Sequence, residues 1–212
     1  MNHKTVLVIS STIIFPVMTL VFSIATTSLG KEPGYFAGFA IYWIYCIAIT
    51  IYVVRRQKQK LTKLFHVSLP QWKGKVFSAL AFVPVVAVLF IQFLPHRHAL
   101  GTSILLLVIV NAIFNGLIEE LYWRGLYLIA FSQNPWMGLV LPSLLFASWH
   151  IALYTIPGMS YGGFAPLVGG SFIMGFLWGL VARKLNGIFY PTIAHIAANF
   201  FAFSGLYIVN SF

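Results

Sequence analysis

The feature that most constrains the fold of this chain is a series of apolar stretches, each long enough to cross a lipid bilayer. We count seven, at residues 5–28, 33–54, 76–94, 102–131, 136–154, 164–183 and 188–209. A crossing needs about 20 mostly apolar residues in a helix, because in lipid every backbone polar group must find its partner within the segment. Only 8% of the residues are charged, against about 25% in soluble domains. The sequence therefore predicts an all-α, polytopic membrane helix bundle of about seven transmembrane helices.

The spans follow one another too closely to leave room for a separate soluble domain, so residues 1–212 are expected to form a single membrane domain. Residues 1–101 carry the first three helices and a basic loop, whereas residues 102–209 carry the helices with unusual polar residues. The first stretch, 5–28, is longer than the core of a signal peptide and lacks a convincing cleavage site, so we expect a retained helix. These features indicate a multi-pass integral protein of the cell membrane.

The basic residues predict the orientation of the bundle. Seven of the thirteen lie between Arg55 and Lys75, in a single loop between two spans. Ten of the thirteen fall on one predicted side and two on the other, and Arg124 lies inside a span. Basic residues in short loops favour the cytoplasmic side, so we expect a cytoplasmic N-terminus and an external C-terminus. The net charge of +10 therefore indicates contact with an anionic cytoplasmic leaflet and not with nucleic acid.

Several other patterns are expected to serve packing or the membrane surface. Segment 57–72 mixes lysines with apolar residues and is predicted to form an interfacial helix on the cytoplasmic leaflet. Gly175 and Gly179 have the spacing that lets membrane helices approach closely. The single cysteine, Cys46, excludes an internal disulfide and is expected to be a small buried residue. The loop histidines of 96–98 are only a weak signal for a metal.

The acidic residues are the rarest in the chain, and two of the three lie where they are most costly. Glu119 and Glu120 are adjacent in the middle of the fourth span. An ionisable residue there costs about 2.5–3.5 kcal/mol on insertion scales. Arg124 lies one turn beyond Glu120 and can offset one charge, while Asn111 and Asn115 continue the face of Glu119. This stretch is either a buried structural ion pair or a reaction site, and the other spans must decide.

Further polar residues lie at similar depth in two other spans. His150 is in the fifth, and His195 and Asn199 share one helix face in the seventh. At about 1.5 Å per residue from the predicted cytoplasmic ends, Glu119 lies roughly 18 Å deep and His150 roughly 21 Å. His195 lies roughly 11 Å deep and Asn199 roughly 17 Å. Because polar residues within spans face the bundle interior, we expect one polar cluster, opening toward the cytoplasmic half.

This cluster contains the groups needed to hydrolyse an amide with activated water. A carboxylate and an imidazole that hold one water form a general-base pair. An asparagine and a second histidine offer N–H donors to the oxyanion that develops. No serine nucleophile is evident, because Ser148 is a sequence neighbour of His150 and neighbours on a helix do not face each other. Cys46 lies in another span, with no histidine or asparagine near it in sequence.

The order of these residues is similar to that of a known family. The predicted spans contain three motifs: Glu119-Glu120-x-x-x-Arg124, Phe146-x-x-x-His150 and His195-x-x-x-Asn199. The ordered set resembles the CPBP family of CAAX-protease and bacteriocin-processing intramembrane proteases, also called the Abi family, which includes the type II prenyl endopeptidases. The resemblance covers about residues 105–205, and the first three spans are expected to contribute only hydrophobicity.

The resemblance implies a catalytic role for four residues. Glu119 would be the base that activates water, and His150 would hold that water. His195 and Asn199 would form the oxyanion hole.

The same resemblance implies that Glu120 and Arg124 orient the helices and tune Glu119. Residues 102–209 would then be the catalytic helices of a glutamate-type endopeptidase that requires no cofactor. Its substrate would be a peptide or a membrane protein. Prenylated proteins are one possibility among the varied substrates of the family.

Three alternatives stay open at this point. A zinc metalloprotease of the same fold would use Glu119, His150 and His195 as ligands with water in the fourth position, although the sequence has no H-E-x-x-H motif. A non-enzymatic bacteriocin-immunity or interaction protein would keep the cluster for structure. A proton-coupled transporter would use buried Glu and His as a proton relay, although seven spans without an evident repeat argue against it.

The predicted orientation can be tested by cysteine labelling in intact cells. A Gln57→Cys variant is expected to react only with reagents that reach the cytoplasm, and a His98→Cys variant is expected to react from outside. The parent chain is the control, because its single cysteine, Cys46, lies in an apolar span. The opposite labelling pattern would reverse the orientation and the side toward which the cluster opens.

Overall fold

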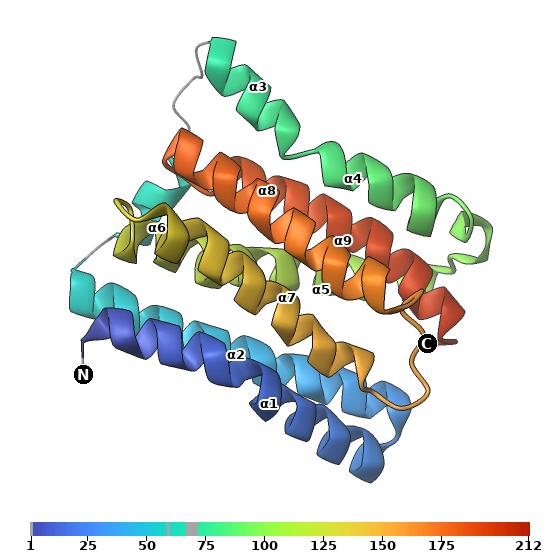
Figure 1. Cartoon of the computed structure of the whole chain (residues 1–212). Helices are drawn as coiled ribbons and strands as arrows, with labels where there is room; N and C mark the ends of the chain where they lie inside the picture. The colour runs from blue at the N-terminus through green and yellow to red at the C-terminus, as the bar shows by residue number, and fades with distance from the viewer. Residues whose placement is uncertain (1, 59, 67–71) are drawn as a thin grey trace.

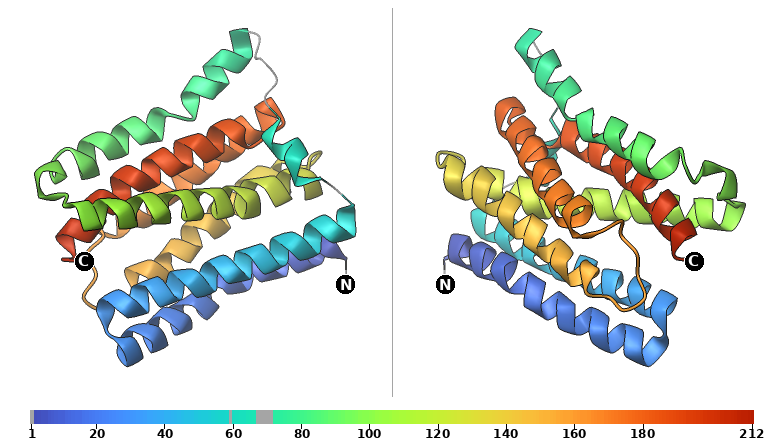
Figure 2. Two further views of the ribbon diagram at one scale, coloured as in Figure 1. Left: turned by 180° about the vertical axis from the view of Figure 1, so that it is seen from behind. Right: turned by 45° about the vertical axis from the view of Figure 1, so that its right-hand side comes forward.

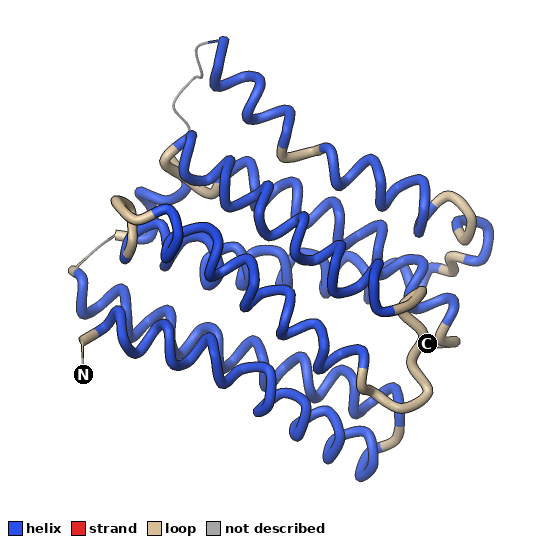
Figure 3. Tube along the Cα trace, in the orientation of Figure 1, coloured by secondary structure: helices blue, strands red, loops and turns tan. Residues whose placement is uncertain are grey.

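The computed structural model describes residues 2–58, 60–66 and 72–212, and within these it contains helices and no strand (Figure 3). Among the described residues, seven helical segments are long and apolar enough to cross a membrane: His3–Leu29, Lys31–Gln57, Gly74–Phe93, Thr102–Ala130, Trp136–Tyr154, Ala165–Leu185 and Phe189–Val209. Their ends differ by at most three residues from the predicted spans. The all-α, seven-span architecture is therefore confirmed.

The first two spans form an antiparallel hairpin of α1 (His3–Leu29) and α2 (Lys31–Gln57) (Figure 1). The chain reverses at Gly30, whose φ of +88° is accessible to glycine at little cost. The helices then approach very closely, because a Cβ on Gly34 would lie 2.5 Å from the Cα of Thr26. Small residues at the turn thus hold α1 and α2 together along one side of the bundle.

The third span lies on the opposite side of the bundle and is bent. It consists of α3 (Trp72–Leu80), α4 (Val83–Val88) and the π-helical η2 (Leu89–Phe93), and it packs along α8 and α9 (Figure 2). The break falls at residues 81–82, just before Pro84. Proline has no N–H to bond the carbonyl four residues earlier, and its ring clashes with that carbonyl.

The remaining spans form the centre of the bundle. They comprise α5 (Thr102–Glu119), η4 (Glu120–Gly125) and α6 (Leu126–Ala130); η5 (Trp136–Val140) and α7 (Leu141–Tyr154); η6 (Ala165–Gly169) and α8 (Gly170–Leu185); and α9 (Phe189–Val209). Here α5 packs against α9, and α7 packs against both α1 and α8. This arrangement places the fourth span between the N-terminal hairpin and α9.

Glycines set the closest helix approaches in this centre. A Cβ on Gly116 of α5 would lie 2.7 Å from the side chain of Ile196 and 3.0 Å from its backbone nitrogen, so α5 and α9 touch almost backbone to backbone. On α8, a Cβ would lie 3.1 Å from Phe146 if placed on Gly175 and 2.7 Å from Leu139 if placed on Gly179. The predicted packing role of the glycine pair on α8 is therefore confirmed.

Contacts between loops show that the strongly basic segments gather at one end of the bundle. The Lys4 ammonium lies 5.5 Å from the centre of the Phe131 ring, and Arg183 donates to the Phe131 carbonyl at 3.2 Å. The Leu64 carbonyl accepts from the Ile188 N–H at 2.7 Å. The two termini lie at opposite ends (Figure 1). Which compartment the basic end faces stays a prediction.

The predicted interfacial helix over residues 57–72 is wrong in the part of this segment that the structure describes. Helix α2 ends at Gln57, Lys58 adopts a left-handed conformation, and only the short 3₁₀ helix η1 (Leu61–Phe65) follows. Residues 59 and 67–71 lie outside the described residues. The reason is tertiary packing, because Leu64 is buried against Leu128, Ala182 and Ile188 and draws the segment against the end of the bundle.

Candidate active site

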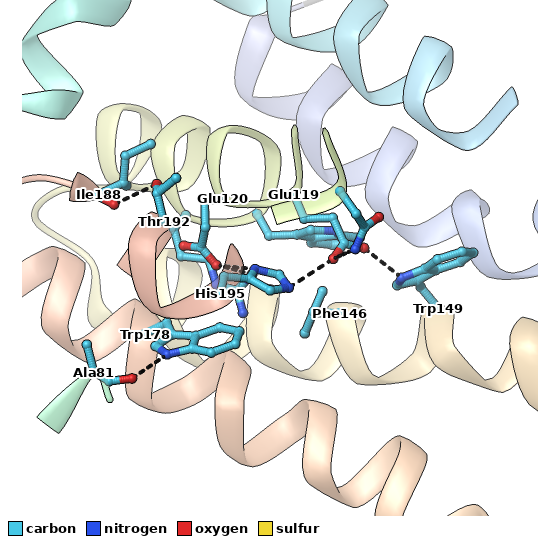
Figure 4. Close-up of polar contacts among 12 residues, drawn as sticks. Ala81, Glu119, Glu120, Phe146, Trp149, Trp178, Ile188, Thr192 and His195 are labelled. Atoms are coloured by element: carbon cyan, nitrogen blue, oxygen red, sulfur yellow. Dashed lines mark hydrogen bonds and ion pairs between the residues drawn. The ribbon is translucent and has the colours of Figure 1, made fainter. Parts of the chain in front are cut away.

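The two glutamates lie where the fourth span changes its helical register. Helix α5 ends at Glu119, and Glu120 begins the π-helical turn η4, in which the Leu126 N–H bonds the Leu121 carbonyl five residues back. Such wide turns within α-helices are frequent at functional sites. Both carboxylates are buried, with Glu119 1% and Glu120 0% exposed. Both face His195 of α9 (Figure 4).

Arg124 forms an ion pair with the Glu120 carboxylate. Its Nη1 lies 3.0 Å from Glu120 Oε1, and the residue is only 4% exposed. The guanidinium also lies 4.3 Å from the centre of the Phe146 ring and 5.5 Å from that of Trp178. Aromatic faces attract cations, so the buried charge of Arg124 is stabilised by one carboxylate and two rings.

His195 joins the two carboxylates. Its Nδ1 lies 2.8 Å from Glu120 Oε1 and its Nε2 lies 3.3 Å from Glu119 Oε2 (Figure 4). An imidazole can donate from both nitrogens only when it is protonated. In that form, two carboxylates, one guanidinium and one imidazolium make a cluster without net charge, which lowers the cost of burying it.

The Trp178 indole fixes the imidazole from the side. Its ring stacks on the His195 ring, with the centres 4.4 Å apart and the planes at 29°. The indole nitrogen donates to the Ala81 carbonyl at 2.9 Å, at the break of the third span (Figure 4). The bend between α3 and α4 therefore supplies the acceptor that holds Trp178 in place.

Three hydrogen-bond donors converge on Glu119, and His195 lies against it. Oε1 accepts from the Tyr42 hydroxyl at 2.6 Å and from the Trp149 indole at 3.2 Å. Oε2 accepts from the Asn115 amide at 2.9 Å and faces His195. An ionised carboxylate offers about four lone-pair sites, so these donors use three of them and His195 faces the same carboxylate. The longest of the four contacts is that of His195.

Tyr42 and Trp149 were not among the predicted site residues, and the expectation that the first three spans contribute only hydrophobicity is wrong. Tyr42 comes from α2 and donates directly to Glu119. The sequence carried a partial signal, because Tyr35, Phe39 and Tyr42 recur at helical spacing in the second span. That pattern indicates an interior face but does not show that a hydroxyl on it meets a carboxylate.

His150 lies beside this cluster. Its Nδ1 bonds the Phe146 carbonyl at 2.8 Å, and because a carbonyl only accepts, Nδ1 carries a proton. The Nε2 atom forms no hydrogen bond with the described residues. The Phe146 ring is 4.7 Å from the His150 ring and 6.1 Å from the His195 ring, between centres. His150, on α7, therefore has one ring nitrogen, Nε2, that is not used in a hydrogen bond with the described residues.

Asn199 follows His195 by one turn of α9. Its Nδ2 is buried, and among the described residues it has no hydrogen-bond partner. The structure thus brings four of the six predicted residues into direct contact, Glu119, Glu120, Arg124 and His195, and leaves His150 and Asn199 without a hydrogen bond to either glutamate.

Of the three residues proposed as zinc ligands in the alternative mechanism, two contact each other, and His150 Nε2 forms no hydrogen bond with the described residues. Glu119 and His195 face each other at 3.3 Å. Over residues 2–58, 60–66 and 72–212, no three His, Cys, Asp or Glu side chains form a group that could hold a metal ion, which also covers the loop histidines. One of these, His96, bonds the Gln92 carbonyl of its own turn at 2.8 Å.

The comparison with known families agrees with the motifs and this geometry. Residues 101–201 match the family model described as Type II CAAX prenyl endopeptidase Rce1-like. This segment is similar to the Rce1-like family. The match confirms the resemblance to CAAX proteases, and the Rce1-like segment contains all six predicted site residues, whereas Tyr42 lies outside it. Comparisons with curated proteins and with solved structures gave no match. The described residues contain seven helices that are long and apolar enough to span a membrane, so the chain is a multi-pass membrane protein, and residues 101–201 are similar to a protease family.

Replacing Arg124 should act mainly through stability. Arg124→Ala leaves the buried Glu120 carboxylate without its guanidinium, and breaking a buried pair in this way costs about 3–5 kcal/mol. Thermal unfolding of the purified protein in detergent measures the loss. Arg97→Ala is the control, because Arg97 donates only to the Leu94 carbonyl of its own exposed turn and should leave unfolding unchanged. Normal melting of Arg124→Ala with lost activity would assign Arg124 a direct catalytic role instead.

Proposed function

We propose that this protein is an intramembrane endopeptidase in which Glu119 activates water to hydrolyse a peptide bond. The observation that carries the proposal is a buried glutamate whose carboxylate is oriented by three side-chain donors and faces His195 at 3.3 Å. Such preorganisation is what a general base requires. It lies within the segment that matches the Rce1-like endopeptidase family.

Water is expected to reach Glu119 on the side of its Oε2 atom. Three hydrogen bonds and the contact with His195 surround the carboxylate, so one of these side chains must move before Glu119 can take a proton. The Nε2 of His195, at 3.3 Å, forms the longest contact and is the donor that yields. The free Nε2 of His150 then provides a second hydrogen bond to the same water.

The reaction follows from these positions. The water oxygen attacks the carbonyl carbon of the peptide while its proton passes to Glu119, and the carbonyl oxygen becomes an oxyanion. The buried Nδ2 of Asn199 is a donor for this oxyanion, and His195 is the second donor once it has left Glu119. When the C–N bond breaks, Glu119 returns the proton to the leaving nitrogen. No metal or other cofactor is required by this scheme.

The substrate class follows from the position of the site. A site buried in a membrane bundle suits a peptide or a membrane-protein segment that reaches it from the bilayer or from the predicted cytoplasmic face. The matched family description names prenyl endopeptidases, so prenylated C-terminal peptides belong among the substrates to be tried.

The Glu119→Gln variant tests the proposed role of the general base. It keeps the shape of the side chain but removes the base, so cleavage of a candidate peptide library by purified protein in detergent should fall about 100-fold or more. Glu32→Gln is the matched control, because Glu32 begins the second span, away from the buried cluster. Cleavage by Glu119→Gln at the wild-type rate would contradict the proposed role.

A further inference from the structure

We propose that Tyr42 is a positioning residue that fixes the orientation of the Glu119 carboxylate for the reaction. The inference rests on the proposed function of Glu119. Tyr42 lies on α2, outside the Rce1-like segment, and it is fully buried. Its hydroxyl forms the shortest of the contacts to Glu119, at 2.6 Å. That distance is typical of a hydrogen bond from a hydroxyl to an ionised carboxylate.

The direction of this hydrogen bond is fixed by a third residue. The Trp123 indole donates to the Tyr42 hydroxyl oxygen at 2.9 Å, and an indole nitrogen can only donate. The hydroxyl therefore accepts from Trp123 and has its single proton left for Glu119. Trp123 belongs to the π-helical turn that follows Glu119, so this hydrogen bond ties the turn to the Tyr42 hydroxyl.

The Tyr42 ring is held as firmly as its hydroxyl. It stacks on the Trp149 ring, with centres 4.0 Å apart and planes at 12°. Both residues of this stacked pair donate to the same oxygen, Glu119 Oε1. The pair thus fixes one carboxylate oxygen from the α2 and α7 side, which leaves Oε2 directed toward His195.

This geometry separates the task of Tyr42 from substrate binding. The Tyr42 hydroxyl bonds Glu119 and Trp123, and both partners are buried. Loss of the hydroxyl should therefore lower kcat, while KM stays close to its wild-type value. Because Tyr42 lies on α2, the α1–α2 hairpin, which carries none of the three motifs, would supply a residue that positions the catalytic base.

Tyr42→Phe removes the hydroxyl and keeps the stacked ring. From the strength of a hydrogen bond to a charged group, kcat should fall about 10- to 100-fold with KM unchanged. The matched control is Tyr45→Phe on the same helix, because Tyr45 donates to the Ser10 carbonyl and not to the site. In the Glu119→Gln background, adding Tyr42→Phe should cause no further loss of rate, since Tyr42 acts through Glu119. Wild-type kcat in Tyr42→Phe would overturn the proposal.

The contact between Tyr42 and Glu119 can also be tested by NMR, without measuring enzyme activity. The chain has only three glutamates, so selective ¹³C labelling of the side-chain carboxyl gives three resonances, assigned with Glu32→Gln and Glu119→Gln. Tyr42→Phe should shift the Glu119 resonance and leave that of Glu32 in place, whereas Tyr45→Phe should shift neither. An unmoved Glu119 resonance in Tyr42→Phe would overturn the proposed contact.

The outcomes distinguish this inference from the proposed function. If the wild-type protein cleaves no peptide, the proposed endopeptidase activity fails. If wild type and Tyr42→Phe cleave equally well, only the role of Tyr42 fails. Should Tyr42→Phe not fold, Trp123→Phe takes its place, because it keeps Tyr42 but frees the hydroxyl to turn, and a smaller loss of kcat is then expected. Wild-type kcat in that variant would likewise overturn the proposal.

Discussion

The whole bundle depends on how two adjacent carboxylates are satisfied where no bulk water can solvate them. Glu120 is met by Arg124 and by one nitrogen of His195, and Glu119 is met by the other nitrogen and by three neutral donors. Removing any charged partner leaves a buried charge unpaired, which is far more costly than losing an exposed ion pair. The close approach of α5 and α9 at Gly116 serves this pairing, because it brings His195 within reach of both glutamates.

Aromatic residues supply most of the other contacts to the charged groups of the site. Tyr42 and Trp149 donate to Glu119, Trp178 stacks on His195, and Phe146 lies against Arg124. Such side chains are apolar enough to sit in a membrane bundle and yet carry one hydrogen-bond donor or a negative ring face. The site is therefore built by helices from both halves of the chain, although the family motifs lie only in residues 101–201.

The sequence predicted most of the fold because the length and apolarity of a membrane span are directly visible in it. It also predicted the Glu120–Arg124 pair from helical spacing. The π-helical turn at Glu120 could not be predicted, since a register shift leaves no mark in a uniformly apolar pattern. Tyr42 was missed because an aromatic residue in such a stretch is ordinarily core. The interfacial helix predicted at 57–72 is wrong in the described part of that segment, because burial of Leu64 against the bundle overrode local amphipathicity.

We propose that side chains of the protein alone activate the water. It is tested most directly by elemental analysis of the purified protein together with its peptide-cleaving activity after exhaustive treatment with EDTA or phenanthroline. We expect no stoichiometric metal and full activity after chelation, because Glu119 needs no ion to act as a base. In a zinc enzyme the metal itself lowers the pKa of bound water to about 7, so removing it stops the reaction. Near one zinc per chain, with activity lost on chelation and restored by zinc, would show that a metal activates the water instead.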